Sequence, residues 1–412
     1  MCCYIQSDRD INIVVKYIGS NDDYEISLSK LQNNPYIYPN ILVMDIKETP
    51  LSRLPNLKGY YNLERLTIHN NPKLKTIDIL DVFPKLTHLS ITNNKRLKKI
   101  EGVHNLSSLE DVIINNNKKL KYIYGSPIIR SDYPIYKECR ILNMANLTTL
   151  NIKHNSLCIP IIISNCPRLQ NIDCSFNNIK MINMDMIPSL EVLAIANNKI
   201  SGVLDVNKFP KLESLLCSDN QLTGIKCHLL SNLKIIGCSR NSISGCLSIY
   251  SKNIEHIYCS KNKINSLDLK NNHGLKQLSC YKNSITSLVA IEVACDHLER
   301  LYCSFNKVHL DFIYKMKKLR HLTCSYTSVD ETFLTSRNIQ KILQMENFVS
   351  YNAKLHNITP RFIDTKFVVN VVNGHLSLYN ANEYIQYINR RNEIARRRML
   401  TAMMFGGIAG AI

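Results

Sequence analysis

The sequence predicts an α/β-type solenoid that is mostly β, in which each turn of the coil adds one short strand to a parallel sheet. The first observation is a pattern, Leu-x-x-Leu-x-(Ile/Cys)-x-x-Asn, which returns thirteen times between residues 41 and 330. The second is its spacing of 21 to 23 residues, broken by one step of 38, because a fixed period in this range is typical of a repeat coil. The copies begin at Ile41, Leu63, Leu86, Leu109, Leu147, Leu169, Leu190, Leu212, Leu233, Ile254, Leu275, Leu298 and Leu319.

Apolar and polar residues alternate within each copy, as in Leu66, Thr67 and Ile68. A period of two indicates a strand with one buried face. Three residues after the strand comes an Asn, whose amide can satisfy backbone N–H and C=O groups that lose their partners where the chain turns inward. We therefore predict a structural Asn ladder, with Thr49 and Thr327 in the atypical terminal copies. Its members are Asn71, Asn94, Asn117, Asn155, Asn177, Asn198, Asn220, Asn241, Asn262, Asn283 and Asn306.

Cysteine takes the third core position in seven copies, where the other copies carry Ile. Cys can act there as a small hydrophobe, so we expect buried free thiols. Disulfides between neighbouring copies are conceivable, but an odd column whose members all point the same way cannot pair fully. No Cys-x-x-Cys pair supports a metal site. The column consists of Cys174, Cys217, Cys238, Cys259, Cys280, Cys303 and Cys324.

This register resembles the leucine-rich repeat family over about residues 41 to 330. It is most similar to the short 21–23-residue classes, which include bacterial surface and effector proteins and uncharacterised proteins of large DNA viruses. The resemblance implies a right-handed coil with a concave parallel sheet of about 13 short strands and a largely non-helical convex side. Extended, polyproline-like or 3₁₀ segments are expected on that convex side.

The domain organisation follows from where the register holds. We expect a cap or degenerate repeat over residues 1–40, the coil over 41–330, and a C-terminal cap over 331–412. An insertion at about 120–146 is interpreted either as a loop that leaves the coil or as an imperfect repeat. Residues 382–404 have helix-like composition with a basic face and run into an apolar tail. That end could dock as a cap, contact an anionic membrane surface or stay disordered.

A partner surface is expected among the outward residues of the concave face, because the core columns are committed to packing. The middle repeats offer bland residues such as Val192, Ala194 and Leu216. The last four repeats offer aromatic and basic residues, which are enriched at interface hot spots, although tyrosines on a sheet can also simply pack together. These candidates are His256, Tyr258, Lys261, Gln277, Tyr281, Lys282, Arg300, Tyr302, Phe305, His321 and Tyr326.

A second candidate surface is basic and follows the Asn column in three successive repeats. With a formal net charge of +18, it predicts attraction to an acidic protein, anionic lipid or nucleic acid, unless these lysines are only solvated turn residues. No motif that reads bases is present, so specific nucleic-acid recognition is not expected. The patch comprises Lys73, Lys75, Lys95, Arg96, Lys98, Lys99, Lys118, Lys119 and Lys121.

These features favour a non-enzymatic scaffold that binds a protein partner, acidic in character, on the concave face of its C-terminal repeats. No catalytic, metal-ligand or phosphate-binding constellation stands out, so no cofactor, metal or small-molecule substrate is expected. The alternative is an adaptor that brings a captured protein to a ubiquitin ligase or to an anionic membrane surface. The N-terminal residues lack a secretory signal, which predicts an intracellular, cytoplasmic protein, in the host cytoplasm if it is viral.

Overall fold

The computed structural model describes most of the repeat region and several segments beyond it. The described residues are 12–17, 24–27, 40–54, 57, 59–79, 83–103, 106–124, 138–269, 272–288, 296–310, 313–325, 327, 341–342, 344, 347–349, 361–364, 367–372 and 375–380. The chain divides into two compact units, Met1–Leu275 and Lys276–Ile412.

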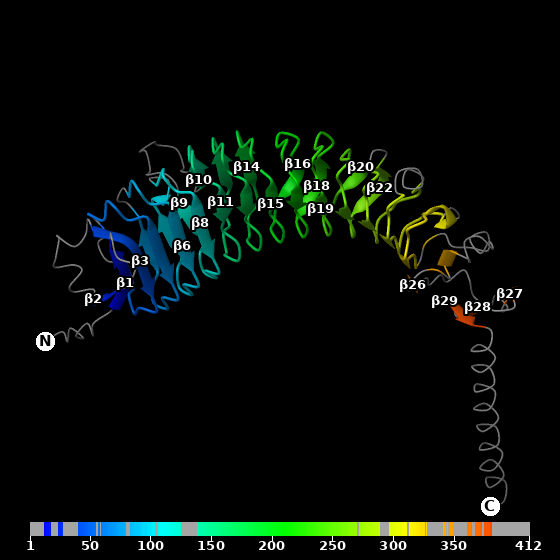
Figure 1. The fold of residues 1–412 in the computed structure, drawn as a ribbon, viewed down its shortest axis with the longest axis horizontal. Helices are drawn as coiled ribbons and strands as arrows, with labels where there is room; N and C mark the ends of the chain where they lie inside the picture. Colours follow the sequence, from blue (N-terminus) through cyan, green and yellow to red (C-terminus); the bar gives the residue numbers. More distant parts are fainter. Residues whose placement is uncertain are drawn as a thin grey trace, which may run out of the picture. The chain divides into compact units, whose positions relative to one another are not determined.

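A parallel sheet with one strand per repeat lines the concave side of the first unit (Figure 1). Neighbouring strands keep one register, so that Leu66, Leu89 and Val112 lie side by side and are fully buried. Each strand thus sends its apolar residues into the coil and its alternate residues outward, which confirms the predicted solenoid. The strands are β3 (Ile41–Lys47), β4 (Arg65–His69), β6 (His88–Thr92), β8 (Asp111–Asn115), β11 (Thr149–Asn151), β13 (Asn171–Asp173), β15 (Val192–Ala194), β17 (Ser214–Leu216), β19 (Ile235–Gly237) and β21 (His256–Tyr258).

Two antiparallel strands cover the first edge of this sheet. Strand β1 (Asn12–Tyr17) pairs with β3 on one side and with β2 (Tyr24–Ser27) on the other. An open edge would leave a row of unpaired N–H and C=O groups that can recruit other chains. The pairing of β1 with β3 satisfies those groups within the molecule.

Short parallel strands also line the convex side of the first unit, where extended, polyproline-like or 3₁₀ segments were expected. They form four small sheets, and the described convex segments of the first unit contain no α-helix, as predicted for a largely non-helical side. The reason is that the repeats stay in register here too, so that successive convex segments can exchange backbone hydrogen bonds. The strands are β5 (Thr76–Asp78), β7 (Lys99–Glu101), β9 (Tyr122–Tyr124), β10 (Cys139–Leu142), β12 (Ile161–Ser164), β14 (Ile182–Asp185), β16 (Ser201–Asp205), β18 (Gln221–Lys226), β20 (Ser244–Ser248) and β22 (Lys263–Asp268).

The 38-residue step contributes to this convex layer at both of its ends. Strand β9 completes the sheet β5-β7-β9, and β10 begins the next sheet, β10-β12-β14. Residues 125–137, between these two strands, lie outside the described residues. The step therefore contains an additional convex strand and marks the point where one convex sheet gives way to another.

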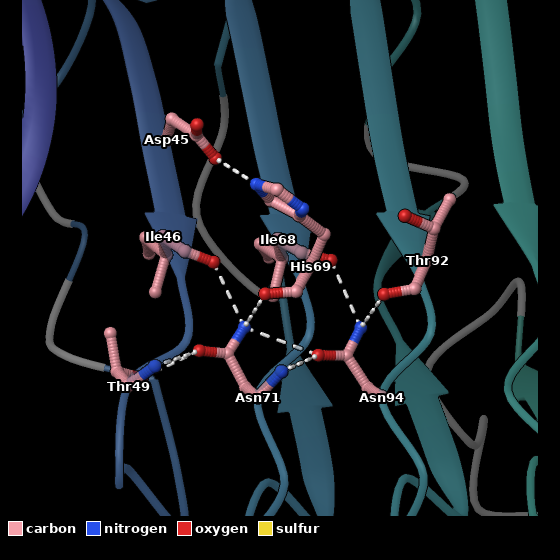
Figure 2. Close-up of polar contacts among 8 residues, drawn as sticks. All are labelled: Asp45, Ile46, Thr49, Ile68, His69, Asn71, Thr92 and Asn94. Carbon is pink, nitrogen blue, oxygen red and sulfur yellow. Dashed lines mark hydrogen bonds and ion pairs between the residues drawn. The ribbon is translucent and has the colours of Figure 1, made fainter.

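The Asn ladder of the first repeats joins each turn to the previous one (Figure 2). The side-chain Nδ2 of Asn71 donates to the carbonyl oxygen of Ile46 at 2.9 Å and to that of His69 at 3.1 Å. Its Oδ1 accepts from the backbone N–H of Thr49 at 2.9 Å. Asn94 repeats the arrangement and accepts from the N–H of Asn71 at 3.0 Å. The ladder is structural, as predicted, because it satisfies buried backbone groups of two adjacent repeats.

From Asn177 onward the ladder accepts from a different backbone group. Oδ1 of Asn177 accepts from the N–H of Leu157 at 3.1 Å, and Oδ1 of Asn198 accepts from the N–H of Ile179 at 3.1 Å. Each donor lies two residues after the preceding ladder Asn, where the later repeats place a buried apolar residue. The first repeats place it three residues after, at Leu74 for example. The chain thus turns inward one residue earlier in the later repeats, and the N–H that needs a partner shifts with it.

The seven cysteines of the core column are fully buried, and every described cysteine is a free thiol. Burial raises the pKa of Cys280 to about 12 and that of Cys217 and Cys303 well above the usual range, because a thiolate would lose its hydration in the core. These thiols therefore act as packing groups at neutral pH and are poor nucleophiles.

The second unit continues the same repeat with four parallel strands. They are β23 (Gln277–Ser279), β24 (Arg300–Tyr302), β25 (His321–Thr323) and β26 (Asn347–Val349). The 3₁₀ helix η3 (Ile313–Lys315) precedes β25, and an antiparallel sheet of β27 (Arg361–Asp364), β28 (Phe367–Val372) and β29 (His375–Asn380) follows. Strand β26 lies beyond the last repeat that the sequence pattern identifies. The basic helix expected within 382–404 and the apolar tail lie outside the described residues.

Candidate functional site

The residue directly before each ladder Asn forms a second column, here called the rim column, at the edge of the concave face. All of its described members have a positive φ between 53° and 58°. Asn and Asp tolerate this left-handed conformation, whereas it costs other side chains about 1–2 kcal/mol each. The rim column consists of Asn70, Asn93, Asn116, His154, Phe176, Asn197, Asp219, Arg240, Lys261, Lys282 and Phe305.

Rim side chains of the first unit contact one another along the coil. The rings of His154 and Phe176 stack with their centroids 4.2 Å apart, and 47% of Phe176 is exposed. Arg240 forms an ion pair with Asp219, with 2.6 Å between Nε and Oδ1. Phe176 was not among the residues predicted from the sequence. The available signal was a bulky residue directly before a ladder Asn, where other repeats place Asn or Asp.

The middle of the concave face in the first unit carries apolar side chains, at positions whose residues were predicted to be bland. Leu216 is 39% exposed and leans over Gly237, where an added Cβ would lie 3.3 Å from the Leu216 Cδ2. Val192 and Ile235 are half-buried and lie on either side of Ser214, two residues before Leu216 on the same strand. These residues provide apolar contact area between more polar repeats.

Three of the predicted partner-binding residues lie in the first unit. His256 and Tyr258 are half-buried outward residues of β21, with ring centroids 6.2 Å apart and nearly parallel planes. Nε2 of His256 lies 3.9 Å from Oε2 of Glu255. Lys261 is exposed in the rim column. The two rings present one aromatic edge on β21.

The second unit brings most of the remaining predicted residues onto one face. Gln277, Arg300 and His321 lie side by side on β23, β24 and β25. At the rim, the Lys282 ammonium lies 5.2 Å from the ring centroid of Phe305, which is 43% exposed. Arg300 and Lys282 are exposed, while Gln277, Tyr281, Tyr302 and His321 are half-buried. Tyr326, also predicted, lies outside the described residues.

The predicted basic patch lies on one edge of the first unit, where the chain turns from the concave sheet to the convex strands. Stacked backbone hydrogen bonds align its outer column: the N–H of Lys98 donates to the carbonyl of Lys75 at 2.9 Å, and that of Lys121 to the carbonyl of Lys98 at 3.1 Å. Leu97 and its counterparts point inward and are fully buried. All nine cations are exposed except Lys99, which is half-buried and paired with Glu101.

Two His–Asp pairs occupy the concave face of the first repeats. Nε2 of His69 lies 3.1 Å from Oδ1 of Asp45 (Figure 2), and Nε2 of His88 lies 3.2 Å from Oδ2 of Asp111. Among the described residues, no three His, Cys, Asp or Glu side chains gather in a way that could hold a metal ion. Over the same residues, no helix has both the length and the apolar character needed to span a membrane.

Solved structures similar to this chain are leucine-rich repeat proteins. One from Leptospira interrogans is 21% identical with a TM-score of 0.52, and the match covers 79% of this chain and 88% of that one. An internalin of Listeria monocytogenes is 15% identical with a TM-score of 0.49, covering 79% of this chain and 89% of that one. A third, internalin J of the same organism, described as including a cysteine ladder, is 18% identical with a TM-score of 0.40, covering 79% and 75%. No protein-family model and no curated protein matches the sequence. The fold is that of a leucine-rich repeat protein.

Proposed function

We propose that the protein is a non-enzymatic scaffold that binds a protein partner on the concave face of its C-terminal repeats. The observation that carries this proposal is the exposed set Lys282, Arg300 and Phe305 around Tyr302 in the second unit. None of these side chains belongs to the core columns. Arginine and aromatic residues supply large contact area and directional hydrogen bonds at interfaces.

Backbone conformation supports a role for the rim residues beyond folding. Lys282 and Phe305 have φ values of 53° and 57°, at a position where Asn197 and Asn93 serve the same turn at lower energetic cost. Strained residues persist where the surrounding structure holds them and often cluster at binding sites. A stacked Lys–Phe pair at the rim is therefore better explained by recognition than by local stability.

The charge of this face favours an acidic partner. The outward positions of the described repeats in the second unit include Lys282 and Arg300 but no Asp or Glu. Complementary charge speeds association and helps to exclude wrong partners. We further infer that binding takes place inside the cell, because the free thiols fit a reducing compartment.

Replacing Phe305 by Asn tests the site without an expected loss of stability. We expect Phe305→Asn to leave the free energy of unfolding unchanged or about 1 kcal/mol higher, because Asn accepts the left-handed backbone. The partner recovered by affinity capture with the wild-type chain should be lost or reduced at least tenfold. Thermal unfolding and quantitative mass spectrometry of the captured proteins measure the two effects.

Phe176→Asn is the matched control, because it makes the same change at the same rim position in the first unit. It should keep the partner. If Phe305→Asn captures the partner normally while Phe176→Asn loses it, the binding site lies in the first unit and the proposed placement is wrong.

A further inference from the structure

We propose that the basic edge of the second to fourth repeats binds the anionic surface of a membrane. The basic edge is defined here as the eight exposed cations of the patch, without the paired Lys99. They are Lys73, Lys75, Lys95, Arg96, Lys98, Lys118, Lys119 and Lys121. This surface is separate from the concave face, so the inference does not depend on the proposed function.

The basic edge is a two-dimensional array of charge. In each repeat the cations occupy the first, second and fourth positions after the ladder Asn, and only Pro72 departs from this rule. The third position is a buried Leu, which anchors each turn in the core. Backbone hydrogen bonds between Lys75, Lys98 and Lys121 keep successive turns at the strand spacing of about 4.8 Å. The fold therefore fixes these positive charges in rows along the coil and in columns across it.

No described acidic side chain neutralises the basic edge. None of its eight side chains forms an ion pair with a residue that the structure describes. Elsewhere in the same unit, cations pair with acids of neighbouring repeats, as Lys153 with Asp173 and Lys234 with Glu213. Like charges at this spacing repel one another, and the repulsion is relieved when an anionic surface approaches.

The composition and geometry of the edge favour lipid headgroups over a nucleic acid. Seven of the eight cations are Lys, a compact point charge, and only Arg96 offers the planar fork that suits bidentate phosphate recognition. The four residues after each of the three ladder Asn residues include no aromatic side chain on which a base could stack, and the nearby Tyr122 on β9 is half-buried. A polyanionic strand presents its phosphates in a line, whereas a leaflet presents headgroups over a plane, which matches the array. Clusters of four to eight Lys and Arg are typical of sites for anionic lipids.

Co-sedimentation of the full-length protein with lipid vesicles tests this inference. The vesicles contain phosphatidylcholine alone or mixed with phosphatidylserine. Each basic residue near an anionic leaflet raises partitioning about fivefold, so the triple variant Lys75→Gln, Lys98→Gln, Lys121→Gln should bind phosphatidylserine vesicles roughly 100-fold more weakly. The wild-type chain should not bind phosphatidylcholine alone. Circular dichroism checks that the variant remains folded.

The matched control changes the net charge by the same amount at three exposed lysines of later repeats, Lys180→Gln, Lys199→Gln and Lys263→Gln. This variant should lose much less binding. If both variants lost vesicle binding equally, net charge alone would explain the binding, and the inference would be overturned. Full binding by the basic-edge variant would place membrane contact elsewhere and also overturn it. So would tight binding to a single-stranded oligonucleotide or to polyglutamate without binding to phosphatidylserine vesicles.

Discussion

The free energy of unfolding should fall steeply between about pH 7.5 and about pH 9.5, because buried thiols stay protonated in the folded chain while those of the unfolded chain ionise near pH 8.5. Burial raises the pKa of Cys139, Cys227 and Cys280 to about 12 and that of Cys174 and Cys238 well above its usual range. Above the unfolded pKa, the unfolded state therefore binds fewer protons than the folded state. Stability is fully present below about pH 7.5 and is lost as pH rises through the unfolded pKa toward the folded values.

The size of this effect comes from the number of thiols. Each one lowers the free energy of unfolding by slightly more than 1 kcal/mol per pH unit once the unfolded thiol ionises. Seven described cysteines have a pKa of about 12 or well above the usual range, so together they remove roughly 10 kcal/mol per pH unit, which is comparable to the whole stability of a typical domain. The later repeats carry Cys at the core position where the earlier repeats carry Ile, so the stability of the later repeats is sensitive to alkali.

Guanidinium unfolding, followed by circular dichroism at several pH values in the presence of a reductant, measures this dependence. The window ends below the usual pKa of Tyr and Lys, so those groups contribute little. Cys217→Ala supplies the control, since it should reduce the slope of stability against pH by the share of one thiol. An unfolding midpoint that does not move between about pH 7.5 and about pH 9.5 would contradict the assignment of buried, protonated thiols.

The core columns could be predicted from the sequence because each repeats the same physical requirement many times. Leu66 and Ile68 alternate with polar residues, as residues of a half-buried strand do. An Asn recurs at the position of Asn71 because every turn leaves the same backbone groups unsatisfied. Extended segments were among the expectations for the convex side, but their pairing into sheets was not predicted. Sequences as different as Thr76–Asp78 and Ile161–Ser164 form them, because only the register of the repeats brings their backbones together.

The candidate surfaces were only partly predictable, since they depend on exposure and on backbone angles. The basic edge was readable, because its lysines follow the ladder Asn at fixed offsets. The left-handed rim column could not be predicted. In the first repeats its residues are Asn, which look like ordinary turn residues, and only Phe176 and Phe305 at the equivalent positions of later repeats are unusual. The change of ladder partner after Asn155 left a signal in the sequence, namely the apolar residue that moves from the third to the second position after the Asn.

Replacing a single ladder Asn by Asp should destabilise the coil by about 3–5 kcal/mol, because several buried backbone groups lose their partners at once. Nδ2 of Asn220 donates to the carbonyls of Ile195 at 2.9 Å and Cys217 at 3.2 Å, while its Oδ1 accepts from the N–H of Ile200 at 3.0 Å. In Asn220→Asp the acceptor bond can survive, but both donor bonds are lost and a carboxylate faces carbonyl oxygens. Urea unfolding at neutral pH measures the change.

Asn197→Asp makes the identical chemical change at the rim and should alter stability by less than about 1 kcal/mol, because Asp219 already occupies the equivalent left-handed position. If both variants unfold alike, the ladder contributes no more than any surface amide.

The large expected difference follows from connectivity. Asn220 bonds to backbone groups on both sides of one interface between repeats, and in a solenoid each repeat is stabilised only by its neighbours. Loss of this one side chain therefore weakens the coupling between the repeats on either side. The coil should unfold in two stages in Asn220→Asp and in a single stage in Asn197→Asp.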